Sequence, residues 1–295
     1  MNDDLISVMI PCYESSKTLA KALASLMLQS HKNWEALVVD DGSADHPEKI
    51  IQFFKDSRIR YFRVPENRGR AYARQVALDN MRGDFLTMLD ADDWILPNKL
   101  ICQLDFLKSN SDLALVSCPV FLVNSSDELV GIERFKQRQG RSFHQPLRNP
   151  QPLPLAHAPI LIRSEFVKGR HYDINLKYSE DLDFFLPILL KQPYGIMGEA
   201  FYVYSFEGNK SLEKLRAQLQ IHKVIFRKFI KTYPLVVSLR ICFASFKILL
   251  LKISFIRPFL KWRHRRKIEE ANEQERLSFK TAYQDIFKFV SKVDS

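Results

Sequence analysis

Short apolar segments alternate with segments of helical periodicity along the first half of the chain. Apolar runs between turn signals predict buried strands, and apolar positions that recur every three or four residues predict helices. Strands are expected at residues 6–10, 36–39, 60–64, 85–89 and 113–123, and helices at residues 19–28, 50–54, 71–81 and 97–107. This alternation indicates βαβ units, and hence an α/β fold with a mostly parallel sheet flanked by helices.

The pattern changes after the last of these strands. Residues 124–159 are rich in Gln, Arg and Pro and are expected to form a long loop, which at this length is either functional or disordered. Regular structure is expected again as a strand over residues 160–162, a helix over 180–190 and a strand over 201–204. A basic helical segment follows. The chain is therefore predicted to hold one large domain, residues 1–211, and an α-helical C-terminal appendage, residues 212–295.

Two groups of aspartates follow strands of the predicted sheet. Asp40 and Asp41 come directly after one strand, and Asp90, Asp92 and Asp93 come after another. Ligands of parallel sheets bind beyond the carboxyl ends of the strands, so both groups should meet at one crevice. Crowded carboxylates repel one another unless a cation lies between them, and their oxygens suit Mn²⁺ or Mg²⁺. Taken alone, each group is equally well explained as a turn or a helix cap.

The positive charge of the chain is concentrated in one segment. The formal net charge is +10, but 15 of the 44 Lys and Arg residues lie within residues 214–267, a range without Asp or Glu. In the remainder, 29 basic residues face 34 acidic ones. A mildly acidic body therefore carries a basic appendage, which nucleic acid or an anionic membrane could attract.

Composition argues against several classes of protein. None of the nine glycines forms a dinucleotide-binding or P-loop fingerprint. The four cysteines are scattered without a C-x-x-C pair, which indicates a reducing compartment and argues against a disulfide scaffold or a zinc ribbon. The first residues carry no basic region of the secretory type, so a cytoplasmic location is expected.

Five short motifs, in the order and spacing of the family, resemble the inverting family 2 glycosyltransferases. Each motif is common alone, but five in succession are specific, and the resemblance covers roughly residues 5–211. The motifs are Pro11-Cys12-Tyr13; Val38-Val39-Asp40-Asp41-Gly42-Ser43 with Asp45; Asn67-Arg68-Gly69 followed by Ala73-Arg74; Leu89-Asp90-Ala91-Asp92-Asp93; and Ser179-Glu180-Asp181-Leu182-Asp183-Phe184.

The resemblance implies a GT-A fold, a nucleotide-sugar donor that is usually a UDP-sugar, and Mn²⁺ or Mg²⁺ as cofactor. It places Pro11, Tyr13, Asp41 and Arg74 around the base of the nucleotide, Asp90 near its ribose and Asp92 on the metal, and it makes Asp181 the general base. Glu14, Asp40 and Asn67 are also expected on the donor side. Glu207 is expected either to join the metal shell or to face away from it.

The chemistry of sugar transfer suits these residue types. A sugar that leaves a diphosphate develops negative charge on the β-phosphate, which a metal ion neutralises. Inversion requires a carboxylate that takes the proton of the acceptor hydroxyl on the opposite face of the sugar ring. Asp181, at the start of a predicted helix, is suited to this task, and a helix cap is its structural alternative.

The chain departs from the family pattern at three positions, none of them Asp92 or Asp181. Glu14 and Gln75 each stand where the family has Asn, and Glu207 stands where it has a histidine that would contact metal or phosphate. His157 has no partner motif in the sequence and is interpreted as a packed or solvated residue.

Three functions are compatible with the sequence. We favour a glycosyltransferase that acts on a hydroxyl of a lipid-linked or polysaccharide acceptor. A nucleotidyltransferase would normally carry a glycine-rich basic loop after its first strand, and residues 11–16 are not such a loop. A non-enzymatic nucleic-acid-binding or scaffold protein would rest on the basic segment alone, and no nucleic-acid partner is expected.

The basic segment contains an apolar stretch of 23 residues between Pro234 and Pro258, which is long enough to span a bilayer. Arg240, Lys247 and Lys252 interrupt it, and each central cation costs about 2.5–3.5 kcal/mol on insertion. Spanning is therefore disfavoured. We expect the segment to lie as a peripheral element on the anionic cytoplasmic face of a membrane, with packing on the body or on a second subunit as the alternative.

Overall fold

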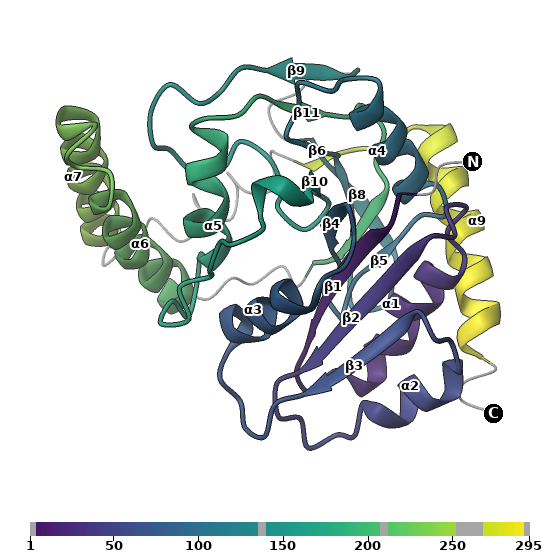
Figure 1. The fold of residues 1–295 in the computed structure, drawn as a ribbon. Helices are drawn as coiled ribbons and strands as arrows, with labels where there is room; N and C mark the ends of the chain where they lie inside the picture. The colour runs from purple at the N-terminus through teal and green to yellow at the C-terminus, as the bar shows by residue number, and fades with distance from the viewer. Residues whose placement is uncertain (1–3, 135–139, 207–211, 252–267, 292–295) are drawn as a thin grey trace.

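The computed structural model describes residues 4–134, 140–206, 212–251 and 268–291, which form two sheets and the helices around them (Figure 1). The strands of the larger sheet are β1 (Ile6–Cys12), β2 (Trp34–Asp40), β3 (Ile59–Arg63), β4 (Phe85–Met88), β6 (Leu115–Ser117), β9 (Ser142–His144), β10 (Leu161–Arg163) and β11 (Tyr194–Ile196). Their order is β3-β2-β1-β4-β10-β6-β11-β9. The strands of the smaller sheet are β5 (Trp94–Ile95), β7 (Val120–Val123), β8 (Leu129–Glu133), β12 (Tyr202–Ser205) and β13 (Ile268–Glu269).

The first four strands of the larger sheet run parallel, and this arrangement creates the edge where ligands are expected. β1 pairs with both β2 and β4, and β2 pairs with β3, all in parallel. β10 is antiparallel to its neighbours β4 and β6. The last residues of β1, β2 and β4 therefore lie at the same edge of the sheet. The predicted α/β fold with helices on the sheet is confirmed.

Helices cover both faces of the larger sheet, because its central strands are apolar on both sides. On β1, Ile6, Val8 and Ile10 face one layer of the core and Met9 faces the other. The first layer contains α1 (Ser16–Met27), α2 (Glu48–Phe54), α4 (Lys99–Lys108) and α9 (Glu273–Val290); the second contains α3 (Arg70–Asn80), α5 (Glu180–Leu189), and parts of α6 (Leu212–Arg227) and α7 (Pro234–Leu250).

Two predictions about single elements are wrong. Residues 113–123 form two strands in different sheets, because the chain leaves β6 at Cys118 and Pro119 and enters β7 beyond them. Proline has no N–H to offer a ladder, so it suits this crossing between sheets. Residues 124–159 are not wholly loop, since they contain β8 and β9. β9 pairs with β11, about fifty residues later, and local periodicity carries no trace of such a distant partner.

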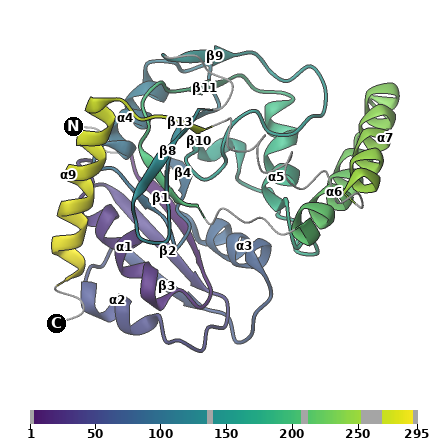
Figure 2. The same ribbon diagram turned by 180° about the vertical axis from the view of Figure 1, so that it is seen from behind.

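The C-terminal region is helical, as predicted, but its helices occupy opposite sides of the molecule in both views (Figures 1 and 2). α9 packs on the body: the Phe279 ring lies 5.3 Å from the Trp94 ring and 5.6 Å from the Phe121 ring, measured between centroids. α6 and α7 pack against each other beside α5. Within the described residues, no helix has the length and apolar character needed to cross a bilayer.

Candidate functional site

The loops that follow β1 and β2 are joined by Glu14. Its backbone N–H donates to Ser43 Oγ at 3.0 Å, and its Oε1 accepts from the Ala44 N–H at 2.8 Å. Its φ of +49° is left-handed, a conformation for which Asn, the family's residue here, is better suited. Pro11 lies at the end of β1, and Tyr13 leaves half of its side chain (50%) exposed. Tyr13 is therefore an exposed aromatic surface at this edge that a planar ligand could contact.

Asp40 is fully buried and fixes its own loop. Its Oδ1 accepts from the Ser43 N–H at 2.8 Å, and its Oδ2 accepts from the Tyr61 hydroxyl at 2.6 Å. Arg63 adds an ion pair at 3.5 Å. Burial and the charge of Asp40 raise the pKa of the Tyr61 hydroxyl above its ordinary value.

Asp41 connects the loop after β2 to the segment that precedes α3. Its two carboxylate oxygens accept from the N–H groups of Arg68 at 2.9 Å and Gly69 at 2.7 Å, and Asn67 Oδ1 also accepts from Gly69 at 3.1 Å. Gly42 permits the approach, because a Cβ there would lie 2.7–2.8 Å from the backbone of Glu66 and Asn67. Asp40 and Asp41 thus hold the loops in shape, and a contact of either with the donor stays a prediction.

Arg74, on α3, is the centre of a buried polar network. Its side chain is 1% exposed, Nη1 donates to Glu180 Oε1 at 2.9 Å, and Nη2 lies 3.2 Å from Asp90 Oδ1 and 3.0 Å from His157 Nε2. Burial alone would raise the pKa of Asp90, but the positive charges of Arg74 and Arg70 hold it below its usual value. The structure therefore places Arg74 among protein side chains, and its predicted contact with the base of a nucleotide is untested.

Asp181 lies in the first turn of α5 and faces the same network. Its Oδ2 is 3.2 Å from Nδ1 of His157, and its side chain keeps 27% of its surface exposed. Burial tends to raise its pKa, but His157, Arg74 and the backbone N–H groups of the helix start together lower it below the ordinary value. Burial and the charge of Arg74 lower the pKa of His157, against the opposing effect of Asp181. Asp181 is therefore an ionised carboxylate that is partly exposed to solvent.

The three aspartates after β4 have three different environments. Asp93 is buried and accepts from the Tyr202 hydroxyl at 2.7 Å and the Ser205 N–H at 2.8 Å, which ties the turn to β12. Burial and the charges of Asp90 and Asp92 raise the pKa of Asp93 well above its usual value. Asp92 is exposed, and its carbonyl oxygen accepts from Ser205 Oγ at 2.6 Å. Of the three, Asp92 is the exposed residue.

Asp92 could serve as one protein ligand of a hard divalent cation whose other ligands are substrate oxygens and water. Within the described ranges, no group of three His, Cys, Asp or Glu side chains could hold a metal by itself. Mg²⁺ commonly binds to proteins through one or two carboxylates together with substrate phosphates and water. An exposed aspartate at the ligand edge of the sheet suits that mode. Glu207, predicted as a second metal contact, lies outside the described residues.

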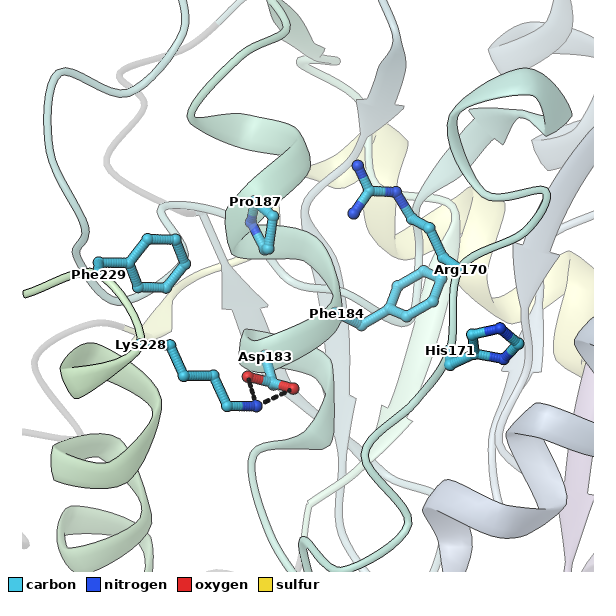
Figure 3. A pocket seen from close by; sticks show the side chains of 7 residues that line it. All are labelled: Arg170, His171, Asp183, Phe184, Pro187, Lys228 and Phe229. Atoms are coloured by element: carbon cyan, nitrogen blue, oxygen red, sulfur yellow. Dashed lines mark hydrogen bonds and ion pairs between the residues drawn. The ribbon is translucent and has the colours of Figure 1, made fainter. Parts of the chain in front are cut away.

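A cavity of about 350 Å³ lies between α5 and the end of α6 (Figure 3). Lys228, just after α6, donates to both oxygens of Asp183 on α5, at 2.7 and 2.9 Å. His222 of α6 lies 3.0 Å from Ser179 Oγ, directly before α5. None of the residues that line this cavity was predicted in the site. Its polar contacts instead attach α6 to the helix that carries Asp181.

Two members of the network were missed by sequence reasoning about single residues. Glu180 was part of a motif but received no role, although its carboxylate is the closest partner of Arg74. His157 was interpreted as a packed or solvated residue near the acceptor region, and the structure brings it between Arg74 and Asp181. No signal in the sequence connects His157 to residues so distant along the chain. Only its position before the short strand β10, a neighbour of β4, could have pointed to the site.

Comparison with known proteins identifies the relatives of this chain. The family model described as Glycosyl transferase family 2 matches residues 7–168. An uncharacterized glycosyltransferase of Haemophilus influenzae is 40% identical over 112 residues, which cover 37% of this chain and 45% of the relative. The UDP-Glc:alpha-D-GlcNAc-diphosphoundecaprenol beta-1,3-glucosyltransferase WfgD of Escherichia coli is 36% identical over 111 residues, 38% of this chain and 44% of WfgD. The matched segments thus span less than half of either relative.

Solved structures share the fold over nearly the whole chain. The crystal structure of S. aureus TarS residues 1–349 in complex with UDP superposes with a TM-score of 0.63 and 20% sequence identity, covering 98% of this chain and 82% of that one. The same part of TarS in complex with UDP-GlcNAc gives a TM-score of 0.61 at 19% identity, with the same coverage. At this identity the likeness establishes the fold, which is of the GT-A type.

The substitution Arg74→Met should destabilise the protein strongly, because it leaves the buried Glu180 carboxylate without its cation. Removal of one partner of a buried ion pair typically costs about 3–5 kcal/mol. We expect a loss of that size in the free energy of unfolding, measured by urea denaturation at pH 7. Arg70→Met is the matched control, since Arg70 is 59% exposed and 4.0 Å from the same carboxylate. Its effect should stay within about 0.5 kcal/mol; equal losses in the two variants would contradict the assignment.

Proposed function

Because this chain belongs to family 2 of the glycosyltransferases, we propose that it transfers a sugar from a UDP-sugar to a hydroxyl of a lipid-linked or polysaccharide acceptor, with inversion at the anomeric carbon. The observation that carries the proposal is the placement of Asp181, ionised and accessible, on the same Arg74 network as Asp90. The names of relatives support the donor and acceptor classes: WfgD is named for UDP-Glc and a diphosphoundecaprenol-linked sugar, and TarS was solved with UDP and UDP-GlcNAc.

The residues divide the reaction between a donor side and an acceptor side. On the donor side, Tyr13 stacks against the base, and Asp90 lies at the ribose with its charge held by Arg74. On the acceptor side, Asp181 accepts the proton of the attacking hydroxyl while the new glycosidic bond forms and the bond to the diphosphate breaks. The electron pair of the broken bond stays on the diphosphate oxygen.

The negative charge that develops on the diphosphate must be neutralised as the bond to the sugar breaks. Asp92 would hold Mn²⁺ or Mg²⁺, which when bound neutralises that charge as a Lewis acid. Arg70 contributes positive charge at the same edge, since it acts electrostatically on Asp90. Asp93 keeps the turn in place through Tyr202 and Ser205, so that Asp92 is presented outward.

Donor choice and the role of Asp181 can be tested together. Purified protein is incubated with UDP-, GDP- and dTDP-sugars, Mn²⁺ or Mg²⁺ and a lipid-linked acceptor, and nucleotide release and thermal stabilisation are recorded. We expect a UDP-sugar to stabilise the protein and to release UDP. Asp181→Asn should keep the stabilisation by the donor and lose transfer about 10²–10⁴-fold, because the base is removed. Release of pyrophosphate from a nucleoside triphosphate would identify a nucleotidyltransferase instead.

The metal assignment makes a separate prediction. Asp92→Asn removes the charge of the proposed ligand and should raise the Mn²⁺ concentration for half-maximal transfer at least tenfold, roughly the loss of one charged ligand contact. Binding of Mn²⁺ with UDP, followed by the paramagnetic relaxation of water, should weaken in parallel. The control is Asp127→Asn, because Asp127 is a surface carboxylate that forms an ion pair with Lys21, a residue distant from it in sequence. Unchanged metal dependence in Asp92→Asn would refute the assignment.

We also propose that the protein works at a membrane surface, and the support is the outer face of α7. Five large apolar side chains on one side of α7 are exposed between 54% and 72%, while Val237, Ala244 and Ile248 on the other side are buried. The exposed residues are Leu235, Leu239, Phe243, Phe246 and Leu249, spaced three and four apart. An apolar stripe of this kind, within the most basic segment of the chain, suits the boundary between lipid headgroups and acyl chains.

Of the cations that interrupt this apolar stretch, Arg240 contacts the rest of the protein, and Lys252 lies outside the described residues. Arg240 Nη2 donates to Asn149 Oδ1 at 3.1 Å, and the Arg240 guanidinium lies 5.8 Å from the Phe226 ring of α6. Lys247 Nζ lies 4.5 Å from the centroid of the Phe243 ring, so this cation is next to the exposed stripe. The five exposed side chains are themselves apolar and can enter the headgroup region while the helix stays attached to α6.

Vesicle flotation tests the outer face of α7. The full chain should float with vesicles that contain phosphatidylglycerol and less with phosphatidylcholine alone, because anionic lipid attracts the basic segment. Leu239→Glu/Phe243→Glu should lower partitioning at least about a hundredfold, since each buried side chain contributes about 1.5–3 kcal/mol. Phe287→Glu on α9 is the control, because Phe287 is equally exposed and should float normally. Equal flotation of all three chains, or dimerisation without flotation, would contradict the proposal.

A further inference from the structure

The hydrogen-bonding chemistry of His157 is determined by its two neighbours. An arginine can only donate hydrogen bonds, so the Nε2 atom that lies 3.0 Å from Arg74 Nη2 must present its lone pair. The single proton of the neutral ring is then on Nδ1, which faces Asp181 Oδ2 at 3.2 Å. The lowered pKa of His157, caused by burial and by the charge of Arg74, agrees with this neutral form.

The segment that carries His157 is held by buried polar side chains. Ser117 Oγ donates to the carbonyl of Ala156 at 2.9 Å, and Gln103 Nε2 donates to the carbonyl of Pro159 at 2.7 Å. Thr87 Oγ1 donates to the carbonyl of Ile160 at 2.7 Å. The donors come from β6, α4 and β4. The position of the imidazole is therefore set by the body of the fold.

We propose that His157 is a positioning residue for sugar transfer: its Nδ1–H holds Oδ2 of Asp181, and Arg74 fixes the tautomer from the other side of the ring. This role rests on the proposed function of Asp181. The acceptor proton then goes to Oδ1 of Asp181 as the glycosidic bond forms and the electron pair of the donor bond goes to the diphosphate. Because Nε2 is occupied by Arg74, the ring does not pass this proton on, so His157 is not itself the base.

The titratable groups that face the ring explain why it can do this at neutral pH. They are Arg74 on α3, Asp90 in the turn after β4, and Glu180 and Asp181 on α5. The carboxylates favour the protonated ring, and Arg74 and burial oppose them. Removal of the Nδ1–H donor should raise the pKa of Asp181, because a hydrogen bond donated to a carboxylate favours its ionised form. Since only the ionised carboxylate accepts a proton, the acid limb of the pH profile should move to higher pH.

Two conservative variants separate the two ring nitrogens. In His157→Asn the amide N–H occupies the place of Nδ1–H, whereas in His157→Gln the amide reaches the place of Nε2. We expect His157→Gln and His157→Ala to lower kcat roughly 10–100-fold, the range for a hydrogen bond to a charged group, with the KM for UDP-sugar unchanged. Their acid limbs should shift to higher pH. His157→Asn should recover most of the lost kcat and the wild-type profile.

A readout without turnover keeps this inference distinct from the proposed function. Nitrogen-15 NMR of the histidine side chains should show His157 as the neutral Nδ1–H tautomer at pH 7, and the Nδ1–H signal should change in Asp181→Asn. A protonated ring or the Nε2–H tautomer would overturn the inference even in an active enzyme. So would equal losses in the Asn and Gln variants without a shift in pH profile, which would indicate a packing role only. Failure of the wild-type chain to transfer any sugar, with the expected tautomer present, would count against the function and not against the His157–Asp181 contact.

Discussion

The burial of one guanidinium organises this site. The Arg74 side chain extends from α3 and contacts the turn after β4, the start of α5 and the His157 segment. A buried cation is costly unless it is paired, and Glu180 and Asp90 supply the carboxylates that pair with it, while its Nε has no hydrogen-bond partner among the described residues. One buried positive charge thus connects α3, the turn after β4, the start of α5 and the segment of His157.

The same constraint assigns different states to chemically identical side chains. Asp90 and Asp181 lie near positive charges and their pKa values are lowered, whereas Asp93 is buried beside two like charges and its pKa is raised. A pKa that differs between the folded and the unfolded protein makes the free energy of unfolding depend on pH, and these shifts act on it in opposite directions. The stabilisation from Asp90 and Asp181 is present above the pKa of an unfolded aspartate, about 3.9, and is lost as the pH falls through their lower folded values. Protonation of Asp93 acts in the opposite direction, since its neutral form is the one that burial favours.

Sequence reasoning reaches the parts of the site that depend on local order, and stops where distant segments meet. The parallel strands and the aspartates at their ends follow from short apolar runs and from chain polarity, and both lie where expected. The different environments of these aspartates cannot be predicted from the sequence, because Asp92 and Asp93 are adjacent in the chain and differ in how β12 covers them. His157 and Glu180 gain their roles from Arg74, across 83 and 106 positions of the chain. The outward side of α7 likewise depends on which face α6 covers, and periodicity alone cannot tell the covered face from the open one.

The attachment of α6 to α5 connects the C-terminal helices to the helix that carries Asp181. His222 and Lys228 contact Ser179 and Asp183, which flank the first turn of α5, and that turn contains Asp181. α6 packs against α7 and is attached to the start of α5, so it connects the helix with the exposed apolar face to the helix that carries Asp181; Figure 3 shows the Lys228–Asp183 contact between them. α9 has no comparable link, since it packs on α1 and the smaller sheet on the opposite side of the molecule. A surface that approaches α7 thus has a defined distance and orientation relative to Asp181. For an acceptor that is anchored in that surface, the fold itself limits how its hydroxyl can approach the base.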